Sequence, residues 1–172
     1  MKKNKFSKNW VTKQRRDVYV RQSKVDGYRA RSVYKLIEID EKFKIFKGAI
    51  SIVDIGAAPG SWSQYAAKCT KNKGLISIDL KEMKPIDNTI QIQGDFTAPD
   101  IQDEIKKLIK TKADVVMSDM AVNTTGIKSI DSIQTGELSK EAMNFAKDIL
   151  SVNGFFISKI FMGSTFNEIV AE

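Results

Sequence analysis

The chain of 172 residues contains no histidine and a single cysteine, Cys69. One cysteine cannot form a disulfide within the chain, and without histidine no metal site of cysteine and histidine can be assembled. The usual imidazole base is also missing, so any proton transfer must use lysine, aspartate, glutamate or tyrosine. We therefore expect neither a disulfide framework nor a metal centre.

Long apolar runs are also missing. No stretch is long enough to span a membrane, and the basic start at residues 1–6 is not followed by the apolar core of a signal peptide. We therefore expect a cytoplasmic protein, in which the sequon at 123–125 has no glycosylation meaning. The length fits one domain with a substantial core. The sequence does not decide the oligomeric state, and a monomer is the simplest expectation.

Positive charge is concentrated at the N-terminus. Residues 1–49 hold 15 Lys/Arg and 5 Asp/Glu, a net of +10, whereas the remainder holds 13 and 16, a net of −3. This asymmetry predicts a basic arm over residues 1–30 that binds phosphate groups, followed by a domain over 31–172. The alternative is a solvated lysine-rich tail.

Alternating strands and helices are predicted after Gly48. The expected strands are 50–55, 75–79, 89–93, 114–118 and 154–161. Runs such as Val115-Val116-Met117 are continuous rather than alternating, as in parallel strands that are buried on both faces. With helices between them, these strands predict an α/β fold with a Rossmann-like, doubly wound sheet covered by helices on both faces. The strand at 154–161 would lie near an edge, which indicates that a partner covers it or that the last strands of the domain are missing.

The predicted helices follow from apolar spacing. A helix is expected around 17–25, and a second one begins after Ser32 as its N-cap. Apolar residues at helical spacing from Trp62 to Cys69 predict a third helix, in which packing against the sheet is the preferred role of Tyr65. Two further helices are expected, over 101–110 and from about 138 to a glycine stop near 153–154.

A small-residue loop at 56–60 connects the first strand of this region to the helix that follows. Small residues let the backbone approach a ligand closely, and the start of a helix offers free N–H groups. The loop lacks the dinucleotide-binding pattern G-x-G-x-x-G. It predicts a site for a nucleotide-like cofactor, and a plain strand-to-helix turn is the alternative.

Charged residues stand at the ends of the following strands. Asp79 ends the second strand, where a carboxylate can accept both hydroxyls of a ribose, and Asp95 stands beside Phe96 after the third. Asp119 closes a further apolar run, and Lys159 interrupts the apolar strand predicted at 154–161. Because binding and catalytic residues of open parallel sheets lie at the carboxyl ends of the strands, we expect these residues to lie close together.

Three segments together resemble the FtsJ (RrmJ, RlmE) family of ribose 2′-O-methyltransferases. They are Val53-Asp54-Ile55-Gly56-Ala57-Ala58-Pro59-Gly60-Ser61-Trp62-Ser63-Gln64, Val116-Met117-Ser118-Asp119-Met120-Ala121-Val122-Asn123 and Arg31-Ser32-Val33-Tyr34-Lys35-Leu36. The similarity runs from about Asp17 to Glu172. It implies a Rossmann-like methyltransferase that uses S-adenosyl-L-methionine to methylate a uridine ribose of 23S ribosomal RNA, with the large ribosomal subunit as partner.

The resemblance also implies the roles of individual residues. Gly60, Trp62, Asp79, Asp95 and Asp119 match the cofactor-binding positions of the family. Lys35, Asp119 and Lys159 match three members of its Lys-Asp-Lys-Glu catalytic set, and Lys159 matches the key catalytic residue. The cations expected to contact RNA are Lys13, Arg15, Arg16, Arg21, Lys24, Arg29 and Arg31, with Tyr19 or Tyr28 as a stacking group.

The chain departs from the family pattern in two places. Val122 stands where proline is common, and the fourth catalytic residue belongs to C-terminal strands that this sequence lacks. Glu168 and Glu172 do not match that motif. One alternative is therefore a non-catalytic RNA-binding or ribosome-assembly module, and another is methylation of transfer RNA or of an mRNA cap. Lys35, taken alone, also fits an ordinary charge on a helix surface.

Overall fold

One parallel sheet organises the protein. The structure is a computed structural model that describes residues 17–70, 74–120, 125–161 and 166–171. The strands pair in the order β3-β2-β1-β4-β5. Their bounds are β1 Ile52–Ile55, β2 Leu75–Asp79, β3 Thr89–Gln93, β4 Ala113–Ser118 and β5 Leu150–Ser158. Because all the neighbouring pairs are parallel, the carboxyl ends of the strands meet at one edge of the sheet.

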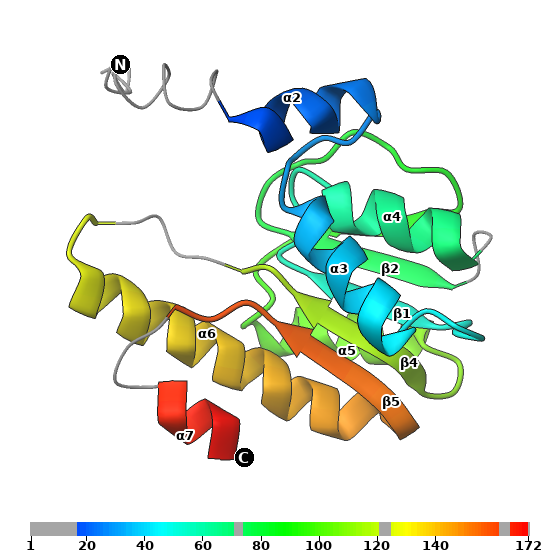
Figure 1. Ribbon diagram of the computed structural model, residues 1–172. Coiled ribbons are helices and arrows are strands. Elements are labelled where there is room, and N and C mark those ends of the chain that lie inside the picture. Colours follow the sequence, from blue (N-terminus) through cyan, green and yellow to red (C-terminus); the bar gives the residue numbers. More distant parts are fainter. Residues whose placement is uncertain (1–16, 71–73, 121–124, 162–165, 172) are drawn as a thin grey trace.

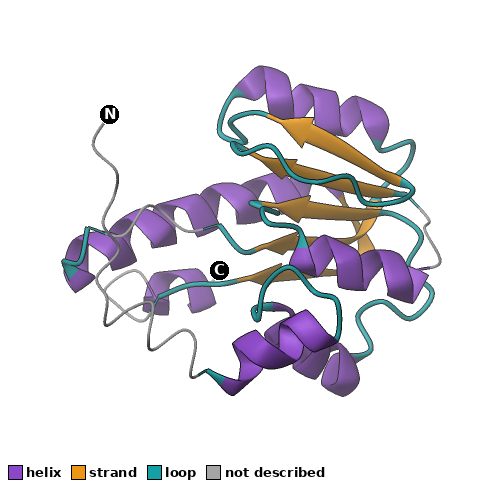
Figure 2. Cartoon of the chain, turned by 90° about the horizontal axis from the view of Figure 1, so that it is seen from above, coloured by secondary structure: helices purple, strands orange, loops and turns teal. Residues whose placement is uncertain are grey.

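Helices cover both faces of this sheet (Figures 1 and 2). On one face α3 (Val33–Phe43) and α4 (Ser61–Thr70) pack through Leu36 and Ala66. On the other face α5 (Pro99–Leu108) and α6 (Lys128–Ile149) pack through Ile105 and Phe145. Continuous apolar strands suit this arrangement, because their alternate residues enter two separate cores. The predicted α/β fold with helices on both faces is confirmed.

Two short helices lie outside these layers. Helix α2 (Val18–Val25) precedes α3, and α7 (Phe166–Ala171) lies beside α6 (Figure 1). Within the described ranges, no helix combines the length and the apolar character needed to cross a membrane.

The boundary between α6 and β5 was wrongly predicted. Helix α6 begins at Lys128, well before the expected start near 138, because its first half buries Ser132 and Thr135 rather than large apolar residues. The helix ends at Ile149 and β5 begins at once. The glycine stop expected at 153–154 is instead an irregularity within β5, where Asn153 has a φ of +67° and the register with β4 shifts.

Strand β5 forms one edge of the sheet, as expected, and Phe155 is 40% exposed there. The strand ends at Ser158 rather than at 161, so Lys159 follows the strand instead of interrupting it.

Ser32 occupies the N-cap position of α3, as predicted, but its side chain does not cap the helix. Its backbone is already helical, with φ −59° and ψ −21°, and its side chain makes no capping hydrogen bond. The hydroxyl lies 3.1 Å from the hydroxyl of Ser61 instead, which joins the start of α3 to the start of α4. The Ser32 side chain therefore contacts a neighbouring helix instead of the backbone of its own helix.

Candidate active site

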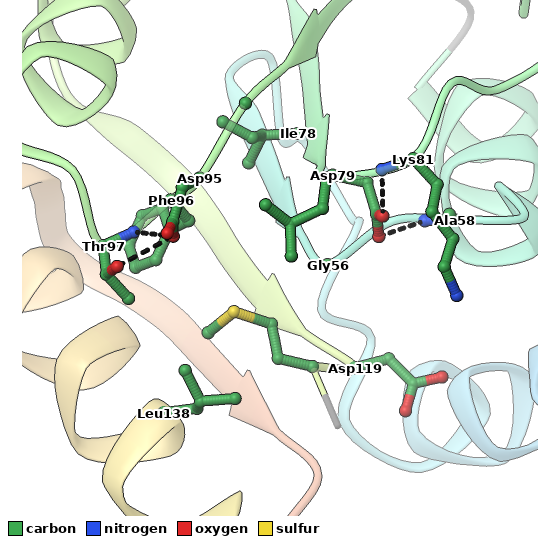
Figure 3. A pocket seen from close by; sticks show the side chains of 13 residues that line it. Gly56, Ala58, Ile78, Asp79, Lys81, Asp95, Phe96, Thr97, Asp119 and Leu138 are labelled. Carbon is green, nitrogen blue, oxygen red and sulfur yellow. Dashed lines mark hydrogen bonds between the residues drawn. The ribbon is translucent and has the colours of Figure 1, made fainter. Parts of the chain in front are cut away.

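A cleft of about 330 Å³ opens at the carboxyl ends of the strands (Figure 3). Its volume is in the range of sites that bind small molecules. The lining residues are Gly56, Ala58, Ile78, Asp79, Leu80, Lys81, Gly94, Asp95, Phe96, Thr97, Asp119, Met120 and Leu138. Three of the predicted cofactor-binding residues, Asp79, Asp95 and Asp119, therefore belong to one cleft.

The Asp79 carboxylate is held in place by two backbone amides. Its Oδ2 accepts a hydrogen bond from the N–H of Ala58 at 2.9 Å, and its Oδ1 accepts one from the N–H of Lys81 at 2.8 Å. The first bond ties the end of β2 to the loop that follows β1 (Figure 3). Each carboxylate oxygen has a second lone pair, so the fixed group can still accept hydrogen bonds from two hydroxyls of a ligand.

Asp95 lies on the opposite wall of the cleft. Its Oδ1 accepts hydrogen bonds from the hydroxyl of Thr97 at 2.7 Å and from the N–H of Thr97 at 2.9 Å. These bonds lower the pKa of the Asp95 carboxyl below its usual value of 3.8, since they favour the charged form. The neighbouring Phe96 is mostly buried, with its ring edge-on to Phe145 at 5.2 Å between centroids. The arrangement presents an ionised acceptor beside an apolar wall.

The loop after β1 contains a close approach that only glycine permits. Gly56 has a φ of +72°, and a Cβ added there would lie 2.9 Å from the Cα of Met120. The carbonyl of Ile78 accepts hydrogen bonds from the N–H groups of Gly56 and Ala57 at 2.9 and 3.0 Å. The predicted cofactor loop is thus packed between the ends of β2 and β4.

Gly60 and Trp62 do not line the cleft. Trp62 is 4% exposed, belongs to the core between α4 and the sheet, and donates a hydrogen bond from its indole Nε1 to the carbonyl of Ser32 at 3.0 Å. Gly60 precedes α4 with a φ of +102°. Any contact that these two positions make with a ligand in the cleft would come from the backbone at the start of α4.

A second cavity of about 400 Å³ lies next to the first. It is lined by Tyr19, Arg31, Ser32, Tyr34, Lys35, Glu38, Asp119 and Lys159. Asp119 lines both cavities, and in Figure 3 its carboxylate points away from Phe96 and Leu138. The three predicted catalytic residues, which come from α3 and from the ends of β4 and β5, therefore share one cavity.

Lys159 is held against Asp119 by its side chain and by its backbone. Its Nζ forms an ion pair with Oδ1 of Asp119 and lies 3.2 Å from the Asp119 carbonyl oxygen. Its backbone N–H donates to the carbonyl of Ser118 at 2.9 Å. Glu168 is elsewhere, on α7, where it pairs with Lys140 of α6 at 2.6 Å. The arrangement therefore places an amine at the point where the two cavities meet.

A buried acid that was not predicted from the sequence lies beneath this site. Asp54 of β1 is fully buried, and its Oδ2 accepts a hydrogen bond from the hydroxyl of Ser63 at 2.5 Å. That hydroxyl also lies 2.7 Å from the hydroxyl of Ser77. Burial raises the pKa of Asp54 from 3.8 to about 7, although the bond from Ser63 opposes this shift. The signal in the sequence was an acid inside the apolar run 52–55.

The basic arm is described only in part. Lys13, Arg15 and Arg16 lie outside the described residues. Lys24 and Arg21 are exposed residues of α2. Arg21 also interacts with another group of the chain. The Arg31 guanidinium pairs with Asp17 at the start of α2.

Arg29, which was predicted to contact RNA, makes hydrogen bonds within the chain. Its Nη1 donates to the carbonyl of Pro59 at 3.1 Å and of Lys84 at 2.8 Å, and its Nη2 donates to the carbonyl of Pro85 at 2.8 Å. Its backbone N–H donates to the side chain of Gln64 at 3.0 Å. The residue joins the end of the predicted arm to the cofactor loop and to the loop after β2.

Acidic residues do not gather into a metal site in the described part of the chain, where no group of three potential ligands is found. The cleft therefore offers carboxylates singly, as acceptors for a ligand.

Comparison with known proteins shows the family of this chain. The model of the FtsJ-like methyltransferase family matches residues 28–172. Ribosomal RNA large subunit methyltransferase E of Pelagibacter ubique is 68% identical over 99% of this chain and 84% of its own length. The protein of that name from Rickettsia akari is 45% identical over 98% of this chain and 77% of its own length.

A solved structure supports the same assignment. A crystal structure from Plasmodium falciparum, described as that of a ribosomal RNA methyltransferase, is 35% identical. It matches 84% of each chain with a TM-score of 0.77. Since the family model and these relatives cover nearly the whole sequence, this chain belongs to the FtsJ-like methyltransferase family.

Proposed function

We propose that this protein transfers a methyl group from S-adenosyl-L-methionine to the 2′-hydroxyl of a uridine ribose in large-subunit (23S) ribosomal RNA. The observation that carries the proposal is the position of Asp119, which lines both the cleft and the cavity that contains Lys35 and Lys159. A donor in the first space and an acceptor in the second would meet at this residue. The relatives named for large-subunit RNA methylation support this substrate, which fits the predicted cytoplasmic location.

The residues of the cleft suit S-adenosylmethionine. Asp79, fixed by two amides, would accept hydrogen bonds from the ribose hydroxyls of the cofactor. Asp95 would accept a hydrogen bond from the amino group of the adenine beside Phe96. The backbone around Gly60 and Trp62, at the start of α4, would contribute N–H donors. When bound, the cofactor supplies an electrophilic methyl group on a sulfonium.

The residues of the second cavity would act on the acceptor. Methyl transfer to the 2′-oxygen would break the carbon–sulfur bond of the donor, and the hydroxyl proton would need a base in this cavity. Lys159 would take that proton in its neutral form, and Asp119 would fix the amine through the contacts described above. Lys35 is an exposed cation in the same cavity, where it would hold the acceptor strand through a phosphate. Alignment of the two reactants would supply a large part of the acceleration.

The first test measures methyl incorporation into large-subunit ribosomal RNA that lacks the modification. We expect Lys159→Ala to lower the rate by roughly a hundred- to ten-thousandfold, the usual contribution of a general base. Its affinity for S-adenosylmethionine, measured by calorimetry, should stay unchanged. Lys107→Ala removes an exposed lysine from α5 on the opposite face of the sheet and is the matched control. Near-normal methylation by Lys159→Ala would rule out its role.

The cofactor and the acceptor need separate measurements. Asp79→Asn should weaken binding of S-adenosylmethionine, because an amide nitrogen replaces one of the acceptor oxygens. If the unaltered protein bound no cofactor, a non-catalytic RNA-binding module would be the better description. Mapping the methylated nucleotide distinguishes large-subunit RNA from transfer RNA or an mRNA cap.

A further inference from the structure

The second cavity has an aromatic wall. Tyr19 of α2 and Tyr34 of α3 both line it, with their ring centroids 5.6 Å apart and their planes tilted by 45°. Tyr19 is 55% exposed, which is unusual for a ring whose only role is to pack one helix on another. A nucleotide consists of a ribose, a phosphate and an aromatic base, and this wall offers a surface for the base.

The wall is held in place by polar contacts on both helices. Asp17 accepts a hydrogen bond from the N–H of Tyr19 at 3.0 Å and pairs with Arg31 in the segment that leads into α3. The Tyr34 hydroxyl donates to Asp26 at 2.6 Å, just after α2. These contacts fix α2 against α3, so the two rings are positioned before any ligand binds. A preformed aromatic surface loses less entropy on binding than a mobile one.

The structure also distinguishes between the two tyrosines that the sequence offered as stacking groups. Tyr28 does not line the cavity, and the Nζ of Lys68 lies 4.2 Å from the centroid of its ring. Its ring is therefore in use as the partner of a cation within the chain. Tyr19 is the ring that faces the candidate catalytic residues.

The charges around the wall suit an anionic strand. The cavity is lined by the cations Arg31, Lys35 and Lys159 and by the acids Glu38 and Asp119, which leaves one positive charge in excess. Cations for the backbone and aromatic rings for the bases are the combination that sites for single-stranded nucleic acid use. In a duplex, by contrast, the faces of the bases are covered by their neighbours.

We infer that Tyr19 and Tyr34 form a stacking site for a nucleobase of the acceptor RNA, and that the cavity therefore takes an unpaired nucleotide rather than one inside a duplex. The inference rests on the proposed function, because it names the form of the substrate at that same site. It adds an aromatic contact to the electrostatic ones, and the two kinds of contact can be separated experimentally.

The test measures the affinity of the full chain for a fluorescein-labelled single-stranded oligouridylate by fluorescence anisotropy. We expect Tyr19→Leu to weaken binding roughly five- to a hundredfold, the usual effect of losing one base–aromatic stack, while Tyr19→Phe keeps the affinity. Because no charge changes, the dependence of affinity on salt should keep its slope in both variants. A blunt-ended RNA duplex of equal length should bind Tyr19→Leu and the unaltered protein equally.

Matched controls separate stacking from folding. Tyr28→Leu makes the same chemical change outside the cavity and should leave affinity for the oligouridylate unchanged. Unfolding in urea and calorimetry with S-adenosylmethionine check that Tyr19→Leu is folded and binds the cofactor. Normal binding of oligouridylate by Tyr19→Leu, or an equal loss with the duplex, would overturn the inference. Because anisotropy needs no methyl transfer, failure of the proposed reaction and failure of the stacking site would be seen separately.

Discussion

The buried carboxyl of Asp54 makes the stability of this protein depend on pH in a region where few other groups titrate. Asp54 is fully buried on β1, and among the described residues its Oδ1 has no hydrogen-bond partner. Desolvation is the main cause that raises its pKa from 3.8 to about 7, and the carboxylates of Asp119 and Asp79 raise it further. The chain has no histidine, so the usual source of titration near neutral pH is absent.

The sign of the effect follows from proton binding. Between the two pKa values the folded state holds a proton on Asp54 that the unfolded state has released. The contribution of this proton to the free energy of unfolding is therefore fully present below pH 3.8, and it is lost as the pH rises through about 7. One proton corresponds to about 1.4 kcal/mol for each pH unit, so the interval between the two values removes about 4 kcal/mol from the free energy of unfolding. That is a large part of the stability of an ordinary domain.

The assay is urea unfolding at several pH values between about 5 and about 7. We expect the free energy of unfolding to fall with pH in the unaltered protein and to fall much less in Asp54→Asn, whose amide does not titrate. Asp87→Asn removes an exposed carboxyl and should keep the slope of the unaltered protein. Equal slopes for Asp54→Asn and the unaltered protein would refute the reasoning, since the proton would then bind elsewhere.

Two further predictions concern the cofactor loop. Gly56→Ala should cost about 1–3 kcal/mol more than Gly48→Ala in urea unfolding, because both glycines have positive φ but only Gly56 would contact Met120; equal losses would mean that the close approach is unimportant. Arg29→Lys keeps the charge but cannot bridge three carbonyls, so it should weaken S-adenosylmethionine binding roughly tenfold by calorimetry without changing the salt slope of RNA binding. Weaker RNA binding with unchanged cofactor affinity would instead support the predicted RNA contact of Arg29.

The sequence was sufficient for the features that depend on neighbours along the chain. The bounds predicted for β2 and β3 were correct, because β-branched and other apolar residues recur within both short segments, which polar residues flank. Asp79 at the end of β2, Asp95 shortly after β3 and Asp119 directly after β4 lie where the predicted strands place them. The packing role preferred for Tyr65 is confirmed, because its side chain lies against the core that α4 shares with residues of the sheet such as Ile52 and Leu75.

Only the tertiary structure decided which side chains meet. Lys35 and Lys159 lie far apart in the sequence, yet they line the same cavity. They meet because α3, which carries Lys35, packs on β1 and β4, and β5, which precedes Lys159, pairs with β4. The fold likewise decided the hydrogen-bond partners of the Arg29 guanidinium and the Ser32 hydroxyl, which lie far away in the sequence. A side chain bonds to whichever group the fold brings within reach, and that choice depends on long-range packing that no short window of sequence contains.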